Sequence, residues 1–274
     1  MFGLGSRGGA LMLCMALLPS MVMAAGKCER LVATGSPDAP PYLWRDPQDP
    51  AHLIGVSADL VAQVAAQLGV KVELLYSGRR SQALEEVRSG CMDLLVDAPL
   101  TLAELETLDY VHPAMVQNDY LVWTRHDSPL VYRSLADLHG HAGAISAKAR
   151  PTQAFQALAK DHLSLVPSDT LALAFQKLML GQAEYVVAGR YSGAAVAQTL
   201  SLAKDVSAHE LPLDRPGLYL ALSHDSACND AWLRGQLAVK MTELAASGVP
   251  QDVLQRNLER WKAEQQAPGN ASKK

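Results

Sequence analysis

The residues from Val96 to Met115 contain four carboxylates and neither lysine nor arginine, directly after the apolar run "MDLLV". The carboxylates are those of Asp97, Glu104, Glu106 and Asp109. Segments that follow the carboxyl end of a parallel strand carry ligand contacts in open α/β sheets. If "MDLLV" is a buried strand, Asp97 stands at its end and could accept a hydrogen bond from an ammonium or hydroxyl group. Its alternative role is to cap the following turn.

A pair of arginines provides the opposite charge earlier in the chain. Arg79 and Arg80 stand at the start of "RSQALEEVRSG", which is read as a helix ending in Gly90. The free backbone amides of a helix N-terminus attract anions, so a guanidinium beside them would add to an anion site. The alternative is that both arginines are solvated surface charges.

The elements that position these residues alternate between strand and helix. Strands are expected at 30–36, 70–76 and 92–98, with helices at 57–69 and 80–90 between them. This alternation is typical of α/β proteins with parallel sheets.

A second set of similar elements follows, and then the chain ends in a strand and two amphipathic helices. The chain therefore predicts two α/β lobes with a helical return to the first. Two crossings between lobes make a hinge, and the cleft lies between the lobes. The expected strands of the second set are 120–125, 142–146, 163–168 and 183–189, its helices 133–141, 152–161 and 169–182, and the closing elements 218–223, 230–248 and 250–266.

The composition argues against several functions. The 274 residues carry 24 Lys and Arg against 28 Asp and Glu, a net charge of −4. Nucleic-acid binding calls for a basic face, so no nucleic-acid partner is expected. The eight histidines are scattered, and the pair in "HGH" (His139 and His141) has too few partners for a zinc site. We expect no metal, no other cofactor and no catalytic residues.

The N-terminus has the layout of a secretory signal peptide. Arg7 precedes the apolar run "ALMLCMALLPSMVMA", which ends in small residues suited to cleavage before Ala25. The alternative is a membrane anchor, but the run is interrupted by Pro19 and Ser20 and is shorter than the ~20 residues that span a bilayer. We therefore expect residues 1–24 to be removed and the protein to be periplasmic.

Three cysteines remain after this cleavage: Cys28, Cys91 and Cys228. In an oxidising compartment an odd number suggests one disulfide and one leftover thiol. The alternative is three free or buried thiols, because no spacing among them is typical of a metal site.

The order of several motifs resembles the bacterial extracellular solute-binding proteins, family 3. The motifs are "PPYLWRDPQDPAHLIGVSADLVAQVAAQLGVKVEL", then "ALEEVRSGCMDLLV", then "LDYVHPAM" before "YLVWTR", where the family has an aliphatic-aromatic-small turn ahead of the first crossing. The resemblance covers nearly all of the mature chain. It implies an α/β fold of the periplasmic-binding-protein-like (type II) kind, a Venus flytrap whose two lobes are joined by a two-strand hinge.

The resemblance also implies approximate domain boundaries. Lobe 1 would comprise residues 25–121 and a C-terminal return over 215–262, and lobe 2 would comprise 122–214. The polar residues 263–274 are expected to be a disordered tail.

The charged anchors of the family's α-amino-acid site are missing from the expected positions. In the family, an Arg soon after the third strand binds the ligand carboxylate, and an Asp at the end of a second-lobe strand binds the ammonium. Here the count places Leu105 at the first position and Gly189 at the second, with Arg190 beside it. The resemblance therefore does not imply an ordinary amino-acid receptor.

Other residues are assigned to the ligand site by the resemblance, each with a plainer alternative. Tyr42 follows Pro40 and Pro41 and would line the cleft, or else pack under a stiff loop. Arg80 falls where the family often stacks an aromatic residue on the ligand. Lys148 and Arg150 lie in the second-lobe turn that presents amides to a carboxylate, or else decorate an exposed loop. Arg190 would open a helix that faces the cleft.

The family's layout bears on the cysteines as well. Because the return strand "LYLALS" runs antiparallel, Cys228 comes to the same end of the lobe as Cys28 and Cys91, away from the cleft. All three pairings stay open, and Cys28–Cys228 is favoured because it would tie the returning segment to the first strand.

Three functions follow from these expectations. The first is a monomeric receptor that closes around a small polar or anionic solute and delivers it to an ABC permease. The second is an accessory or signalling module, associated with a membrane sensor or a dehydrogenase, that uses the same fold. The third is an enzyme, since cyclohexadienyl dehydratases resemble this fold, but no set of a general acid and an anion clamp is recognisable.

Overall fold

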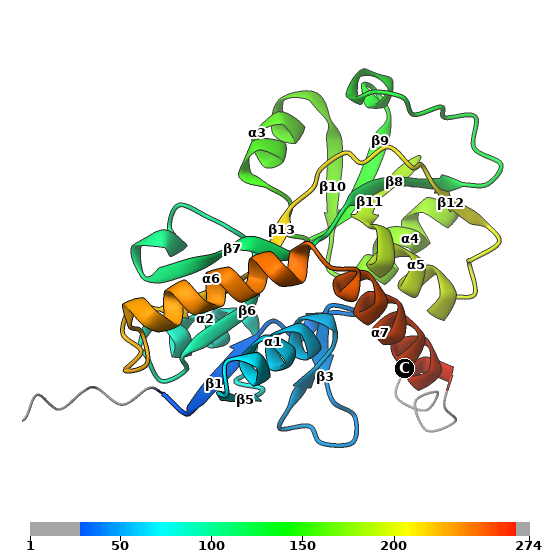
Figure 1. The fold of residues 1–274 in the computed structure, drawn as a ribbon. Helices are drawn as coiled ribbons and strands as arrows, with labels where there is room; N and C mark the ends of the chain where they lie inside the picture. Colours follow the sequence, from blue (N-terminus) through cyan, green and yellow to red (C-terminus); the bar gives the residue numbers. More distant parts are fainter. Residues whose placement is uncertain (1–27, 267–274) are drawn as a thin grey trace, which may run out of the picture.

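The computed structural model describes residues 28–266, which form two α/β lobes, each built on a five-stranded sheet (Figure 1). The expected signal peptide, residues 1–24, lies outside the described residues, as do residues 267–274. Within 28–266, no helix is long and apolar enough to cross a membrane.

The sheet of lobe 1 is mixed, with strand order β5-β1-β6-β13-β7. The first three of these pair in parallel, whereas the returning strand β13 is antiparallel to both of its neighbours. The strands are β1 (Arg30–Gly35), β5 (Lys71–Leu74), β6 (Leu94–Ala98), β7 (Leu108–Gln117) and β13 (Gly217–Ser223), and the helices of this lobe are α1 (Val56–Gln67), α2 (Arg80–Arg88), α6 (Ala231–Ala245) and α7 (Val249–Gln266).

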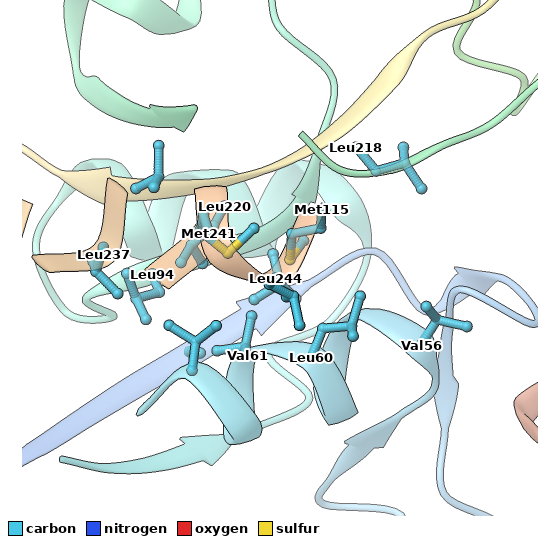
Figure 2. Packing of buried hydrophobic residues seen from close by; sticks show 14 of the residues in the cluster. Val56, Leu60, Val61, Leu94, Met115, Leu218, Leu220, Leu237, Met241 and Leu244 are labelled. Carbon is cyan, nitrogen blue, oxygen red and sulfur yellow. The ribbon is translucent and has the colours of Figure 1, made fainter. Parts of the chain in front are cut away.

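Apolar side chains from both ends of the chain form the core of lobe 1. Leu60 and Val61 of α1 lie against Leu94 of β6, and Leu220 and Met241 come from the returning segment (Figure 2). In α1 the buried positions recur at the spacing of one helical face. The fold of this lobe therefore requires the C-terminal residues, because α6 and β13 supply part of its core.

Lobe 2 is built on the strand order β10-β9-β11-β8-β12. In its core, Trp123 of β8 contacts Phe175 of α4 edge to face, with ring centroids 5.6 Å apart. Its strands are β8 (Tyr120–Arg125), β9 (Ala142–Ser146), β10 (Ser164–Ser168), β11 (Tyr185–Gly189) and β12 (Val206–Ala208), and its helices are α3 (Gln153–His162), α4 (Leu171–Met179) and α5 (Arg190–Thr199). The short helix expected at 133–141 is a single 3-10 turn, Leu135–Leu138.

A small three-stranded sheet lies in the long loop after β1, where the sequence predicts no strand. It consists of β2 (Asp38–Ala39), β3 (Leu43–Arg45) and β4 (Leu53–Ile54). Gly55 follows it with a φ of 133°, and a Cβ there would lie 2.5 Å from the Tyr42 carbonyl oxygen. Only glycine adopts this backbone conformation without strain and leaves that space, so Gly55 lets helix α1 start close beneath Tyr42.

The segment "LDYVHPAM", expected to be a turn, belongs instead to the ten-residue strand β7. Pro113 lies within this strand and cannot donate a backbone hydrogen bond. β7 is at the edge of its sheet and pairs with β13 alone, and an edge strand is where proline is tolerated. The turn was expected only from the family motif, and the pairing of this segment with β13 makes it a strand instead.

The chain crosses between the lobes at two places within the described residues. β7 ends at Gln117 and β8 begins at Tyr120, and the return runs from β12 to β13. The two crossing segments are hydrogen-bonded to each other: the Asn118 amide donates to the Pro216 carbonyl at 2.9 Å, and the Tyr120 amide donates to the Asp214 carbonyl at 2.9 Å. The expected boundaries at 121/122 and 214/215 are near these contacts and stay predictions.

Helix α7 also contacts both lobes, running beside α1 and α5 (Figure 1). It continues to Gln266, so the expected disordered tail from residue 263 begins inside the helix. Glu264 explains the extra turn, because it accepts a hydrogen bond from the Trp44 indole at 2.8 Å and pairs with Arg260 at 3.1 Å.

A disulfide joins Cys28 to Cys228, across a sequence separation of 200 residues, and Cys91 is an exposed free thiol. This is the pairing favoured from the sequence. It ties the start of β1 to the segment just after β13, so the two parts of lobe 1 are covalently connected.

Removal of this disulfide is expected to destabilise the protein strongly. Cross-links that close long loops restrict the unfolded chain most, so the C28S/C228S double variant should lose about 2–5 kcal/mol of unfolding free energy. Urea unfolding followed by circular dichroism measures this loss. Cys91→Ser is the matched control and should unfold like the wild type; an equal loss there would contradict the assignment.

Candidate functional site

The candidate site is a cleft between the lobes, with a volume of about 150 Å³. Residues from both lobes and from the first crossing line it. The polar residues of this lining are Ser36, Asp38, Tyr42, Arg80 and Asp97 from lobe 1, Ser146, Lys148, Arg150 and Ser192 from lobe 2, and Asn118 and Tyr120 at the crossing.

Five of the seven residues considered for the ligand site line this cleft: Tyr42, Arg80, Asp97, Lys148 and Arg150. The other two lie elsewhere. Arg79 is exposed at the N-cap of α2. Arg190 opens α5 as expected, but it pairs with Glu210 at 2.7 Å and borders a separate hollow near the start of α7.

Arg80 is held in place by a carboxylate from the acidic stretch. Its guanidinium lies 3.1 Å from the Glu104 carboxylate, and the two side chains are 18% and 8% exposed. Glu104 also accepts a hydrogen bond from the Tyr110 hydroxyl at 2.8 Å. Leu105, which the family count places at the arginine position, is 42% exposed. The acidic stretch therefore supplies the counter-charge that fixes Arg80 in the cleft wall.

Arg150 approaches the same space from lobe 2. Its guanidinium donates to the carbonyls of Ala147 and Ala149 in its own loop, at 3.3 and 2.7 Å. Within residues 28–266 no carboxylate forms an ion pair with it. Desolvation and then the nearby Arg80 guanidinium lower the pKa of Arg150. The two arginines thus form a positive pair across the cleft, and both also border a larger adjoining hollow of about 420 Å³.

Lys148 connects the lobes directly. Its ammonium lies 3.0 Å from the carboxylate of Asp38, which belongs to the small sheet of lobe 1. These side chains are 53% and 44% exposed, and ion pairs in such settings contribute about 0–1 kcal/mol. The pair therefore marks where the lobes meet but is too weak to hold them closed by itself.

Asp97 is a buried carboxyl group at the end of β6. Its φ of 53° lies in the left-handed region, which aspartate and asparagine tolerate better than most residues. Gly35 makes room for it, since a Cβ there would lie 2.9 Å from the Asp97 Oδ1 atom. Desolvation raises the pKa of Asp97 to about 7, against the opposing effects of Arg80 and the Ser36 amide.

The cleft wall near α5 contains neutral polar groups that lack partners. Within the described residues, neither the Tyr42 hydroxyl nor the Asn118 side-chain oxygen makes a hydrogen bond, although both are buried. Gly189 lies beside Asn118, and a Cβ there would come within 2.5 Å of the Asn118 Oδ1 atom. Burial raises the pKa of the Tyr42 hydroxyl, so this group stays neutral.

The sequence analysis assigned no site role to six polar residues of the lining: Ser36, Asp38, Asn118, Tyr120, Ser146 and Ser192. The place of Asn118 at the crossing could have been predicted from the sequence, because it lies two residues before the expected strand 120–125, where the chain leaves lobe 1. Asp38 was hidden by the unpredicted small sheet.

Nothing in the described part of the chain suggests a resident metal site, since no three His, Cys, Asp or Glu side chains of residues 28–266 cluster suitably. Besides the carboxyl groups of Asp38 and Asp97, the polar groups that line the cleft are guanidinium, ammonium, amide and hydroxyl donors. Such groups can bind a carboxylate or another small oxyanion directly.

Two lobes, two crossings and a cleft between them define a type II periplasmic binding protein, and this confirms the fold expected from the sequence. The chain belongs to the bacterial extracellular solute-binding proteins, family 3, whose sequence model matches residues 31–261. No curated protein sequence matches the chain.

Solved structures share the fold at low sequence identity. The GluR0 ligand-binding core complexed with L-glutamate has a TM-score of 0.65 and 20% identity, over 86% of this chain and 99% of that one. A histidine kinase sensor domain has a TM-score of 0.64 and 21% sequence identity, over 84% of this chain and 96% of that one. A third structure is the amino acid ABC transporter substrate-binding protein AbpA from Streptococcus pneumoniae, bound to L-arginine. Its TM-score is 0.62 and its sequence identity 18%, over 85% of this chain and 96% of that one.

The raised pKa of Asp97 predicts a pH-dependent stability. The folded protein binds this proton more tightly than the unfolded chain, whose carboxyl has the ordinary value of 3.8. The contribution is therefore fully present below pH 3.8 and is lost as the pH rises towards 7. Asp97→Asn cannot ionise, and asparagine suits the left-handed backbone. Its stability relative to wild type should grow by roughly 2–3 kcal/mol between pH 5 and pH 8.

Urea unfolding of both proteins at the two pH values measures this change. Asp252→Asn, a substitution at an exposed carboxylate of the same lobe, is the control and should show little growth. An unchanged difference between Asp97→Asn and wild type would mean that Asp97 titrates like an ordinary carboxyl.

Proposed function

We propose that this protein is a periplasmic receptor that closes around a small anionic solute. The observation that carries this proposal is the placement of Arg80 and Arg150, from opposite lobes, on one cleft. Like charges that face each other repel, and an anion between them would convert repulsion into two charge-assisted interactions. A carboxylate is the simplest group that fits between two guanidinium groups.

Closure by such a ligand follows from its contacts with both lobes. A ligand shifts an open–closed equilibrium by its difference in affinity for the two states. An anion bound to Arg80 alone gains nothing from closure, whereas one that also contacts Arg150 does. The cleft volume of about 150 Å³ favours a solute of a few heavy atoms over a large one.

The partner of the closed form is proposed by analogy with related structures. AbpA is described as a substrate-binding protein of an amino acid ABC transporter, which supports delivery of the solute to an ABC permease. The similar histidine kinase sensor domain supports a second candidate, a signalling or accessory module read by a membrane sensor. In both cases the role proposed for this chain is binding and not catalysis, acting as a monomer in the periplasm.

A thermal-shift screen of small organic acids, amino acids and polyamines tests the proposal. A ligand that binds only the folded protein raises its melting temperature as its concentration increases. We expect carboxylic acids to give such a rise and polyamines to give none. A rise with polyamines alone would contradict an anionic solute.

Substitutions in the arginine pair should remove the effect. Arg150→Gln is expected to weaken binding of the best acid by about tenfold or more, since charge-assisted hydrogen bonds contribute about 1.5–3 kcal/mol. Isothermal titration calorimetry measures the affinity. The control is Arg79→Gln, which removes the same charge from an exposed neighbour of the cleft and should bind like wild type.

Arg80 must be substituted together with Glu104, because Arg80→Gln alone would leave the buried Glu104 carboxylate without its ion-pair partner. The R80Q/E104Q double variant keeps the local charge balanced and should also bind the acid at least about tenfold more weakly. Wild-type affinity in both this variant and Arg150→Gln would overturn the proposed site.

A further inference from the structure

The part of the cleft near α5, away from the arginine pair, indicates which group the solute carries besides its negative charge. Away from the adjoining hollow that the arginine pair borders, the polar part of the lining includes the Tyr42 hydroxyl, the Asn118 amide and the Ser192 hydroxyl, with Gly189 beside Asn118. None of these side chains carries a charge. The solute must therefore place an uncharged group here, if it reaches this end of the cleft.

Each carboxylate in the lining is already engaged. Asp38 forms the ion pair with Lys148 at 3.0 Å. Asp97 is 5% exposed, accepts a hydrogen bond from the Ser36 amide at 3.4 Å and has Gly35 against its Oδ1 atom, so burial favours its neutral form. Glu104, just outside the lining, is committed to Arg80 and Tyr110. An ammonium group entering the cleft would lose its water without gaining a free carboxylate, and burying an unpaired charge is costly.

The Asn118 amide offers a different kind of partner. Its oxygen is buried and makes no hydrogen bond within the described residues. A buried acceptor without a hydrogen bond destabilises the protein, so a ligand group that donates to it is favoured. Rotation of the amide presents either its oxygen or its NH₂ group to the cleft, and a hydroxyl can both donate and accept.

Gly189 makes this arrangement possible. A side chain at this position would collide with the Asn118 oxygen, because even its Cβ would lie 2.5 Å away. An acidic side chain at position 189 and the present position of Asn118 are therefore mutually exclusive. The Asn118 amide can occupy its position only because residue 189 is a glycine and carries no carboxylate.

We propose that the solute is a hydroxy acid, whose carboxylate binds between Arg80 and Arg150 and whose hydroxyl is recognised by Asn118. This inference rests on the proposed function and narrows its ligand class. Tyr42 is placed to add a second hydrogen bond to the same hydroxyl. A solute that carries an ammonium in place of the hydroxyl is rejected, because the cleft lacks a free carboxylate to receive it.

The test compares acids that differ only in this group. Wild-type protein is titrated calorimetrically at pH 6.5 with L-lactate against L-alanine, and L-malate against L-aspartate. We expect the hydroxy acid of the better pair to bind at least tenfold more tightly than its amino counterpart. Equal binding, or tighter binding of the amino acid, would overturn the inference while leaving the anionic receptor intact. Binding of none of the four would overturn both.

Asn118→Asp tests the residue itself. This substitution keeps the side-chain shape and supplies the missing carboxylate, so it should reverse the preference: the hydroxy acid binds at least tenfold more weakly, and the amino acid becomes measurable. Gln117→Glu introduces the same charge one residue away, outside the cleft lining, and should keep the wild-type preference. An unchanged preference in Asn118→Asp would assign the selectivity elsewhere and overturn the role of Asn118. The wild-type comparison does not depend on the folding of either variant.

Discussion

The two antiparallel hydrogen-bonded segments that join the lobes determine how all other groups of the cleft face one another. One segment contains Asn118 and Tyr120, and the other contains Asp214 and Pro216. Arg80 is carried on lobe 1 and Arg150 on lobe 2, so their separation depends on the angle at this joint. Asn118 belongs to the joint itself. A ligand that contacts both arginines and Asn118 would therefore touch each moving part and the axis about which they move.

The electrostatics of the cleft come from an excess of cations over available carboxylates. Arg80, Lys148 and Arg150 enter the lining, whereas Asp38 is paired and Asp97 is buried in a setting that favours its neutral form. Glu104 reduces this excess but also immobilises Arg80, which keeps the guanidinium oriented before a ligand arrives. Pre-ordered donors lose less entropy on binding, so the pair formed with Glu104 can support affinity as well as compete with it.

Periodicity and turn residues were sufficient to predict most of the fold, and the failures have identifiable causes. β8 and β9 both occupy the expected residues, and β8 is rich in the β-branched and aromatic side chains that favour strands. β7 was missed because the family motif assigned a turn to this segment, whereas its pairing with the distant strand β13 is a tertiary property. Arg79 and Arg80 look alike in sequence, yet the helix directs one to solvent and the other to Glu104. The roles of Asn118 and Asp38 could be recognised only once the hinge and the small sheet were known. Both depend on backbone pairing that the local sequence does not reveal.

The disulfide between Cys28 and Cys228 also sets the mechanical character of the molecule. It turns everything from β1 to the end of β13, lobe 2 included, into one covalently closed ring. A stretching force applied ahead of Cys28 and beyond α7 would pass through the sulfur atoms and bypass that ring. Only α6 and α7 would then extend under load, while the cleft and both sheets would carry no direct tension through their backbones. Tension would be borne first by the helices that complete lobe 1.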